Sequence, residues 1–291
     1  MEILRNIEVE KPSEKSIYCD VFFNMDKANK PVVLFNHGFK GFKDWGNWDQ
    51  VAENFANAGY VFIKFNQSRG GINFPDMQDL ADLEAFSTNT IGSELNNMEQ
   101  MIQWISSNNM LPLDLIDDSK IHLMGHSRGG ASVLVAASKS PQVKSVICWA
   151  AVSDWDSHFQ KLNIEKWKED GISYVLNSRT NQELPLKYEI YEEYKSHRDD
   201  YSIEGATKSL DIPIFLVHGT EDETVLFNQA LSIKGWGKNV ELYLIPNANH
   251  VFGAKHPWDK NELPNQLKKV VDITIDFISR QAALQLEFIF N

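Results

Sequence analysis

Short runs of hydrophobic residues alternate along the chain with longer segments in which hydrophobic positions recur every three or four residues. The short runs predict strands and the longer segments predict helices. The predicted strands are 3–9, 16–23, 31–36, 60–66, 120–124, 144–150, 213–218 and 240–245. The predicted helices are 48–58, about 91–107, 128–139, 224–235 and 263–282.

The character of the strands predicts how they pair. The later strands are continuously hydrophobic, as is typical of a parallel sheet that helices cover on both faces. The first two alternate between hydrophobic and polar residues, which favours an antiparallel start. We therefore expect an α/β protein with a mostly parallel, eight-stranded sheet and right-handed crossovers.

Residues 155–207 interrupt this alternation, and we call them the insert. They hold no convincing strand and are dense in charge, as in EKWKED and YEIYEEYKSHRDDY. A linker would not hold so many aromatic residues, so we predict a helical cap inserted in a core of residues 1–154 and 208–291. The aromatic residues of the insert are Trp155, Phe159, Trp167, Tyr174, Tyr188, Tyr191, Tyr194 and Tyr201.

Composition excludes several classes of function. Lys and Arg number 28 and Asp and Glu number 40, so the formal charge is 28 − 40 = −12. Nucleic acid and anionic membranes attract basic surfaces, so neither is an expected partner. No apolar run is long enough to span a bilayer, and residues 1–15 do not resemble a signal peptide. The only cysteines, Cys19 and Cys148, give no metal-binding or disulfide spacing, and we expect a cytoplasmic protein.

The sharpest motif is Gly125-His126-Ser127-Arg128-Gly129-Gly130, which follows a predicted strand and opens a predicted helix of small residues. This context is that of a nucleophile elbow, G-x-S-x-G, whose tight turn excludes bulky neighbours and exposes the serine hydroxyl. Ser127 is therefore the candidate nucleophile. The helix start directs the Arg128 N–H toward a developing oxyanion.

A serine nucleophile needs a base and an acid that orients the base. Loops at the carboxyl ends of two later strands offer both, in His218-Gly219-Thr220-Glu221-Asp222-Glu223 and in Asn247-Ala248-Asn249-His250. Open α/β sheets place their sites at such strand ends, so we predict Asp222 as the acid and His250 as the base. Competing acids are Glu221 and Glu223 beside Asp222, and Asp154 and Asp156 after an earlier strand.

A second oxyanion donor is expected in the loop Asn36-His37-Gly38-Phe39-Lys40-Gly41-Phe42, where the Phe39 N–H would pair with that of Arg128. His37 is expected to brace this loop. The other histidines have simpler interpretations. His122 and His218 are expected to be structural, His256 solvated, and His158 and His197 within reach of substrate or on the surface of the insert.

Together, GHSRGG, the HGF loop, HGTED and NANH resemble the α/β-hydrolase superfamily. Within it the chain resembles dienelactone hydrolase and serine aminopeptidase-like esterases, including bacterial cinnamoyl and feruloyl esterases. The resemblance covers roughly residues 30–150 and 210–280. Dienelactone hydrolases use a cysteine nucleophile where this chain has Ser127, and the HGGG and HGGPG loops of other relatives are absent. Arg69 resembles the arginine of the family's Arg-Gly turn, a structural residue.

These features predict a serine hydrolase that cleaves esters through an acyl-enzyme on Ser127, with a small-molecule substrate and no metal or organic cofactor. The aromatic insert favours hydrophobic or aromatic esters, with Trp155 and Trp167 as candidate substrate contacts, although the aromatic residues could equally form the core of the insert. One alternative is an aminopeptidase- or oligopeptidase-like serine peptidase, whose amine site Glu189, Glu192 or Glu193 could supply. The other is a non-catalytic binding protein.

The last residues carry a separate prediction. Leu284, Leu286, Phe288 and Phe290 alternate with other residues, and this period of two predicts a half-buried strand. We expect that strand either to fray or to dock on an apolar surface, which would be the chain's own sheet edge or a second protomer. A homodimer is therefore a possible assembly.

Overall fold

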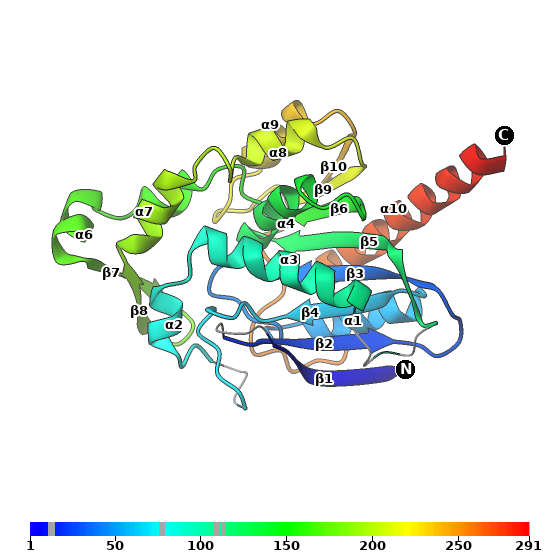
Figure 1. Cartoon of the computed structure of the whole chain (residues 1–291), viewed down its shortest axis with the longest axis horizontal. Coiled ribbons are helices and arrows are strands. Elements are labelled where there is room, and N and C mark those ends of the chain that lie inside the picture. Colours follow the sequence, from blue (N-terminus) through cyan, green and yellow to red (C-terminus); the bar gives the residue numbers. More distant parts are fainter. Residues whose placement is uncertain (11–14, 76–78, 108–110, 112–113, 291) are drawn as a thin grey trace.

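The computed structural model describes residues 1–10, 15–75, 79–107, 111 and 114–290. Its centre is an eight-stranded sheet in the order β1-β2-β4-β3-β5-β6-β9-β10 (Figure 1). The strands are β1 (Glu2–Val9), β2 (Ile17–Phe23), β3 (Lys30–Asn36), β4 (Val61–Phe65), β5 (Ile116–His126), β6 (Val143–Trp149), β9 (Ile214–Gly219) and β10 (Val240–Ile245). β2 pairs antiparallel with β1 and β4, and the other pairs are parallel, so the predicted sheet is confirmed.

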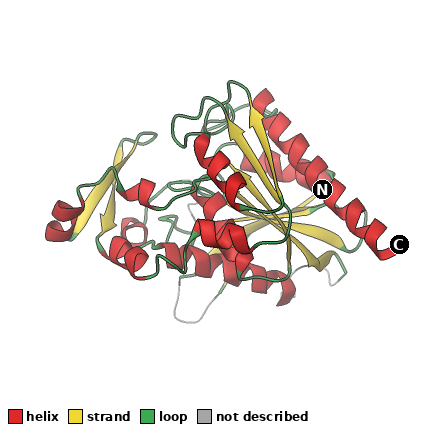
Figure 2. Ribbon diagram, turned by 90° about the horizontal axis from the view of Figure 1, so that it is seen from above, coloured by secondary structure: helices red, strands yellow, loops and turns green. Residues whose placement is uncertain are grey.

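The central strands β3, β4, β6 and β9 are buried on both faces of the sheet. Successive side chains point to opposite sides of a sheet, so each strand contributes to two hydrophobic clusters. In β3, Val32 and Leu34 join one hydrophobic cluster, whereas Val33 and Phe35 join the other. The first cluster packs under α3 (Ile91–Ser107), α4 (Arg128–Ser138), α8 (Ile203–Ser209) and α9 (Asn228–Trp236). The second packs under α1 (Trp48–Asn57) and α10 (Asn265–Phe290), so helices cover both faces (Figure 2).

The insert differs from its prediction because it contains a β-hairpin. It is made of α5 (Asp156–Phe159), α6 (Ile164–Asp170), β7 (Ile172–Asn177), β8 (Gln182–Lys187), α7 (Glu189–Ser196) and α8. The expectation of a purely helical segment was wrong because only one face of the hairpin is buried. Leu184 and Leu186 are buried while Tyr174 and Leu176 are exposed. Polar residues and Pro185 also interrupt the two strands, whose sequences are ISYVLN and QELPLK. The unpredicted α2 (Leu83–Ser87) packs against β8.

The predicted C-terminal strand was also wrong, because α10 continues without a break to Phe290. No Gly or Pro interrupts residues 265–290, and Ala, Leu, Gln and Glu, which favour helices, fill much of residues 281–287. The end of α10 extends away from the sheet (Figure 1). The side chains of residues 284–290 lie outside the described part, and so does their predicted docking.

None of the helices in the described ranges is long and apolar enough to cross a membrane.

Candidate active site

Ser127 occupies the turn between β5 and α4, where its backbone has φ 56° and ψ −122°. A positive φ is uncommon for a residue other than glycine and strains the backbone locally. The turn is tight on both sides. A Cβ on Gly125 would lie 2.2 Å from the Gly129 oxygen, and one on Gly129 would lie 2.3 Å from the Asn36 oxygen. No side chain larger than hydrogen would therefore fit at either motif glycine without a clash.

Asp222 and His250 meet at the neighbouring strand ends. Asp222 lies in the turn after β9 and His250 in the loop after β10, and backbone hydrogen bonds join the two segments, including Glu221 N–H to the Ala248 oxygen at 3.0 Å. His250 Nδ1 lies 2.8 Å from Asp222 Oδ2. An ionised carboxylate only accepts, so Nδ1 carries the proton and Nε2 is left as the basic nitrogen.

The surroundings of Asp222 keep it ionised. Its Oδ1 accepts the N–H groups of Thr224 and Val225, both at 2.9 Å. Burial alone would raise the pKa of Asp222, but hydrogen bonds from His218 and His250 lower that pKa well below its usual range. A charged acid at this place stabilises a protonated His250.

The competing acids either have other partners or are exposed to solvent. Glu221 and Glu223 are exposed to solvent. Asp154 accepts the backbone N–H groups of Asp156 and Ser157 at the start of α5. Asp156 pairs with Arg198 at 2.6 Å.

Two histidines hold this arrangement in a way the motifs did not predict. His218 Nε2 lies 2.7 Å from the Val225 oxygen and 3.2 Å from Asp222 Oδ2, so it donates to both acceptors and links β9 to the acid. His126 Nε2 donates to the His250 carbonyl oxygen at 2.9 Å. Burial lowers the pKa of His126 to about 3, so it acts as a neutral donor. Two hints of these roles were present in the sequence: His126 lies within the elbow motif, and His218 lies at the end of a predicted strand.

The HGF loop lies directly beside the elbow. A Cβ on Gly38 would lie 3.0 Å from the Ser127 Cβ. The Arg128 guanidinium lies 5.4 Å from the centre of the Phe39 ring, so the two predicted oxyanion residues are neighbours. His37 Nδ1 lies 2.9 Å from the Gly38 oxygen, and Lys40 Nζ donates to the Leu176 oxygen of β7 at 3.0 Å. These contacts fix the loop locally and tie it to the insert.

The two tryptophans predicted to contact substrate belong to the packing of the insert. Trp155 is 3% exposed and Trp167 is 1% exposed. Their indole N–H groups donate to the Tyr201 and Leu186 carbonyl oxygens, each at 2.7 Å. The rings around Trp167 are those of Phe159, Tyr188 and Tyr191. Both rings are therefore part of the packed interior of the insert, and contact with substrate stays a prediction for each of them.

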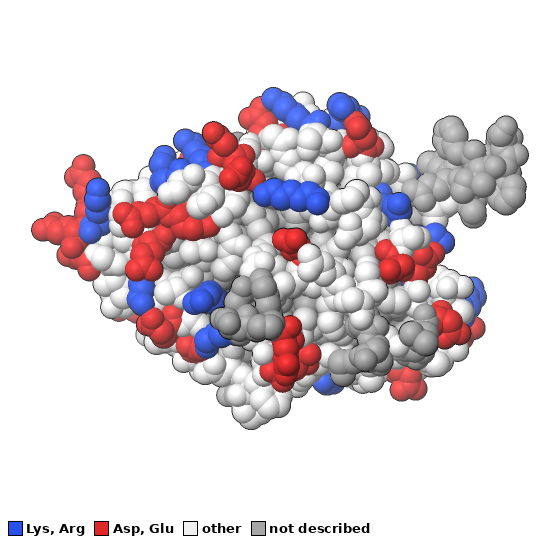
Figure 3. All heavy atoms as spheres, viewed as in Figure 1, with Lys and Arg blue, Asp and Glu red and all other residues white. Residues whose placement is uncertain are grey.

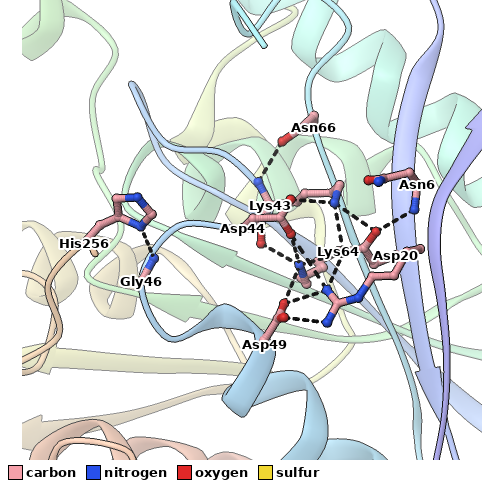
Figure 4. Close-up of polar contacts among 10 residues, drawn as sticks. Asn6, Asp20, Lys43, Asp44, Gly46, Asp49, Lys64, Asn66 and His256 are labelled. Carbon is pink, nitrogen blue, oxygen red and sulfur yellow. Dashed lines mark hydrogen bonds and ion pairs between the residues drawn. The ribbon is translucent and has the colours of Figure 1, made fainter. Parts of the chain in front are cut away.

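The remaining predicted residues have mainly structural contacts. Arg69 Nη1 donates to Thr88 Oγ1 at 2.9 Å, and His122 Nδ1 lies 2.8 Å from Ser145 Oγ. His256 is not simply solvated, because its Nδ1 accepts the Gly46 N–H at 2.8 Å (Figure 4). His197 stacks on Tyr201.

Three neighbouring carboxylates have the spacing of a metal site, but they pair with cationic side chains instead. Among the described residues, ligand oxygens of Asp20, Asp44 and Asp49 lie within 4.8 Å of one another. Cationic side chains already fill the space between them (Figure 4). Lys43 and Lys64 each approach Asp20 to 2.9 Å, and Arg5 approaches Asp49 to 2.6 Å. These residues form an ion-pair network that joins β1, β2, β4, α1 and the loop before α1.

Comparison with known proteins decides the family. The model of the prolyl oligopeptidase family matches residues 48–269. The chain belongs to that family. Among curated protein sequences, none matches the chain.

Solved structures show the same fold. Est1E from Butyrivibrio proteoclasticus is 17% identical with a TM-score of 0.68, covering 96% of this chain and 100% of its own. The α/β-hydrolase GrgF from a Penicillium species is 15% identical with a TM-score of 0.73, covering 97% and 100%. Dienelactone hydrolase from Anabaena variabilis is 16% identical with a TM-score of 0.61, covering 96% and 97%. The α/β-hydrolase fold implied by the motifs is confirmed.

Proposed function

We propose that this α/β-hydrolase cleaves carboxylic esters with Ser127 as nucleophile, His250 as general base and Asp222 as its orienting acid. The observation that carries the proposal is the 2.8 Å hydrogen bond between His250 and a buried, ionised Asp222, at the carboxyl ends of β9 and β10 on the same edge of the sheet as the elbow. That bond sets the histidine tautomer that a serine nucleophile needs.

The mechanism proceeds in two steps of acyl transfer. Ser127 Oγ attacks the ester carbonyl carbon while its proton passes to His250 Nε2. The oxyanion that forms accepts hydrogen bonds from the backbone N–H groups of Phe39 and Arg128. The tetrahedral intermediate collapses, and His250 returns the proton to the departing alcohol. Water then attacks the acyl-enzyme with His250 again as base, which releases the acid and restores Ser127. The reaction calls for no metal or organic cofactor.

We further propose that residues 155–207 form a cap domain on a core of residues 1–154 and 208–291. Two contacts support this role: Lys40 of the HGF loop bonds to β7, and Trp155 bonds to Tyr201 within the insert. The aromatic core of the insert stabilises the cap, while its other surfaces contact the loops beside Ser127. A small or medium hydrophobic ester is the substrate class we favour.

The family match favours a second candidate, a serine peptidase with the same triad. An aminopeptidase would need a carboxylate for the substrate amine. Glu189 and Glu192 are exposed, and Glu193 Oε1 already accepts the Tyr201 hydroxyl and the Gly92 N–H. Glu193 Oε2 is buried without a partner among the described residues, so Glu193 is the carboxylate that could bind an amine. Esters are our first choice because the aromatic insert favours a hydrophobic substrate.

The test is a panel of p-nitrophenyl esters of increasing chain length beside amino-acid p-nitroanilides. We expect turnover of short and medium esters, and a fall in kcat of about 10⁴- to 10⁶-fold in Ser127→Ala. Ser232→Ala, an exposed serine on α9, is the matched control and should be unchanged. Faster turnover of the anilides would favour the peptidase, and activity retained by Ser127→Ala would refute the nucleophile.

A further inference from the structure

Two consecutive side chains, those of Asn66 and Gln67, hold the HGF loop at both of its ends, and we call them the clamp. Gln67 Nε2 donates to Asn36 Oδ1 at 2.8 Å, at the residue where β3 ends and the loop begins. Asn66 Oδ1 accepts the Lys43 N–H at 2.7 Å, at the residue that follows the loop (Figure 4). All four residues are buried, which strengthens both hydrogen bonds. The mechanism above does not use the clamp.

The loop between these two anchors needs outside support because its backbone is strained. Lys40 has a φ of 61°, in the left-handed region that residues other than glycine rarely adopt. The Gly41 N–H bonds back to the Gly38 oxygen at 3.0 Å, which closes a tight turn around Phe39. A strained backbone of this kind persists only where its surroundings over-determine it. The clamp supplies two of the fixed points.

The turn that carries the clamp is itself fixed to neighbouring helices. The Ser68 N–H donates to Asn97 Oδ1 of α3 at 2.7 Å, and Asn97 is buried. Arg69 Nη1 donates to Thr88 Oγ1 at the end of α2, at 2.9 Å. The clamp is therefore a fixed reference for the HGF loop, not a pair of side chains that can follow it.

The first anchor lies directly against the elbow. A Cβ on Gly129 would lie 2.3 Å from the Asn36 carbonyl oxygen, so the elbow packs against the root of the loop. Phe39, whose N–H is the proposed oxyanion donor, lies between the two anchors. A shift of either anchor would move that N–H relative to Ser127. The proposed acid and base would stay in place, because they follow the distant strands β9 and β10.

We propose that Asn66 and Gln67 are positioning residues that hold the Phe39 N–H where the oxyanion forms. This inference rests on the proposed ester hydrolysis and adds the residues that keep its oxyanion donor in place. A misplacement of about 1 Å near the reacting atoms can cost about 100-fold in rate. The oxyanion exists only after attack has begun, so loss of a clamp bond should slow the chemical step and leave substrate binding unchanged.

Gln67→Met tests the first anchor, since methionine has a similar length but cannot bond to Asn36. We expect kcat on a short p-nitrophenyl ester to fall about 10- to 100-fold, with KM within about twofold of wild type. An alkyl boronic acid forms a tetrahedral adduct on serine, so its inhibition constant should rise by the same factor as kcat/KM falls. The pH midpoint of kcat/KM should not move, because it reports His250. Gln103→Met, at an exposed glutamine of α3, is the control.

Asn66 offers a rescue test at the other end of the loop. Asn66→Leu removes the acceptor of the Lys43 N–H, whereas Asn66→Asp keeps one. We expect Asn66→Leu to lower kcat as Gln67→Met does, and Asn66→Asp to retain most of the wild-type rate. Hydrogen exchange in the peptide that holds residues 36–43 gives a readout that does not depend on turnover. It should quicken in Gln67→Met and Asn66→Leu while exchange in β9 and β10 stays unchanged.

Each outcome decides the matter. Unchanged exchange of residues 36–43 in both variants would overturn the clamp, whether or not the protein hydrolyses esters. Faster exchange with unchanged kcat and boronate affinity would overturn the role in catalysis while leaving ester hydrolysis intact. So would a raised KM at constant kcat, or a shifted pH midpoint. Turnover of no ester by the folded wild-type protein would refute the proposed function and the positioning role, while the exchange result would still decide whether the clamp holds the loop.

Discussion

At the scale of single residues, Asp222 differs from its acidic neighbours in what it touches. Both of its oxygens are engaged, by two backbone N–H groups on one side and by His250 and His218 on the other. Glu221 and Glu223 have the same charge but are exposed. Only the buried carboxylate can fix the tautomer of His250.

Replacing the Asp222 carboxylate by an amide should cause a large loss of activity. In Asp222→Asn the side chain can donate to His250 and favour the wrong tautomer, so we expect kcat to fall about 10⁴-fold with the fold retained. Steady-state ester hydrolysis measures this, with Glu221→Gln and Glu223→Gln as controls that stay near wild type. A small effect at Asp222 beside a large one at Asp154 would move the acid to the loop after β6.

Asp20 illustrates a different use of a buried carboxylate. Burial would raise its pKa, but Lys64 and Lys43 outweigh that effect and lower the pKa below its usual range. An acid with a depressed pKa contributes stability above its unfolded pKa, and loses that contribution as pH falls through the acid range. The network should therefore stabilise the protein at neutral pH and fail in acid.

Asp20→Asn removes the fully buried carboxylate that Lys43 and Lys64 share, and leaves them only the partly exposed Asp44 and Asp49. We expect it to destabilise the protein by about 3 kcal/mol at pH 7, the lower end of the range for a broken buried ion pair. Urea denaturation at several pH values measures this. The gap between variant and wild type should shrink as pH falls below about 4, the unfolded pKa of Asp. Asp211→Asn removes an exposed pair with Lys238 and should cost no more than about 1 kcal/mol. A constant gap down to acid pH would contradict the role of Asp20.

At the scale of elements, the insert is held by its own aromatic core. Trp167 packs among three aromatic rings and satisfies its indole N–H within the insert. The exposed face of the β7–β8 hairpin carries Tyr174 and Leu176 instead. Buried and exposed aromatic residues of the insert should therefore behave differently on truncation.

Trp167→Ala should destabilise the protein by about 3–5 kcal/mol, as expected for a large buried aromatic side chain. We expect little effect on the relative rates of bulky and small esters, because the ring is buried in the core of the insert. Tyr174→Ala, at an exposed position, should change stability by no more than about 0.5 kcal/mol. Unchanged stability in Trp167→Ala together with altered ester selectivity would restore Trp167 as a substrate contact.

The same elements show what the sequence could predict. The central strands β3, β4, β6 and β9 were predictable because they are buried on both faces and therefore read as hydrophobic runs. β1 and β10 are partly exposed, but they still carry enough hydrophobic residues to be recognised. β7 and β8 were missed because one face is solvated, and the end of α10 was misread because Leu284, Leu286 and Phe288 also alternate by chance within a helix. The elbow and the Asp222–His250 pair follow from local motifs at strand ends. The contact between Phe39 and His158 could not be predicted, since these residues meet only through the packing of the insert on the core.

At the scale of the whole molecule, the sheet brings Ser127, Asp222 and His250 to the carboxyl ends of three different strands, while the insert approaches the same edge (Figure 1). Acidic and basic side chains are interspersed on the face shown in Figure 3, and the net charge is −12. A site at the carboxyl edge of the sheet is typical of proteins that bind small substrates. The negative net charge would repel a polyanionic partner.

The most direct test of a serine-based hydrolase is covalent labelling with a fluorophosphonate, followed by peptide mass spectrometry. Such a reagent captures a serine only where a base activates it, so we expect one adduct on the peptide that contains Ser127. Labelling should disappear in Ser127→Ala and slow strongly in His250→Ala, while Ser232→Ala labels like the wild type. A folded wild-type protein that takes no label, or that is labelled at another serine, would contradict the account.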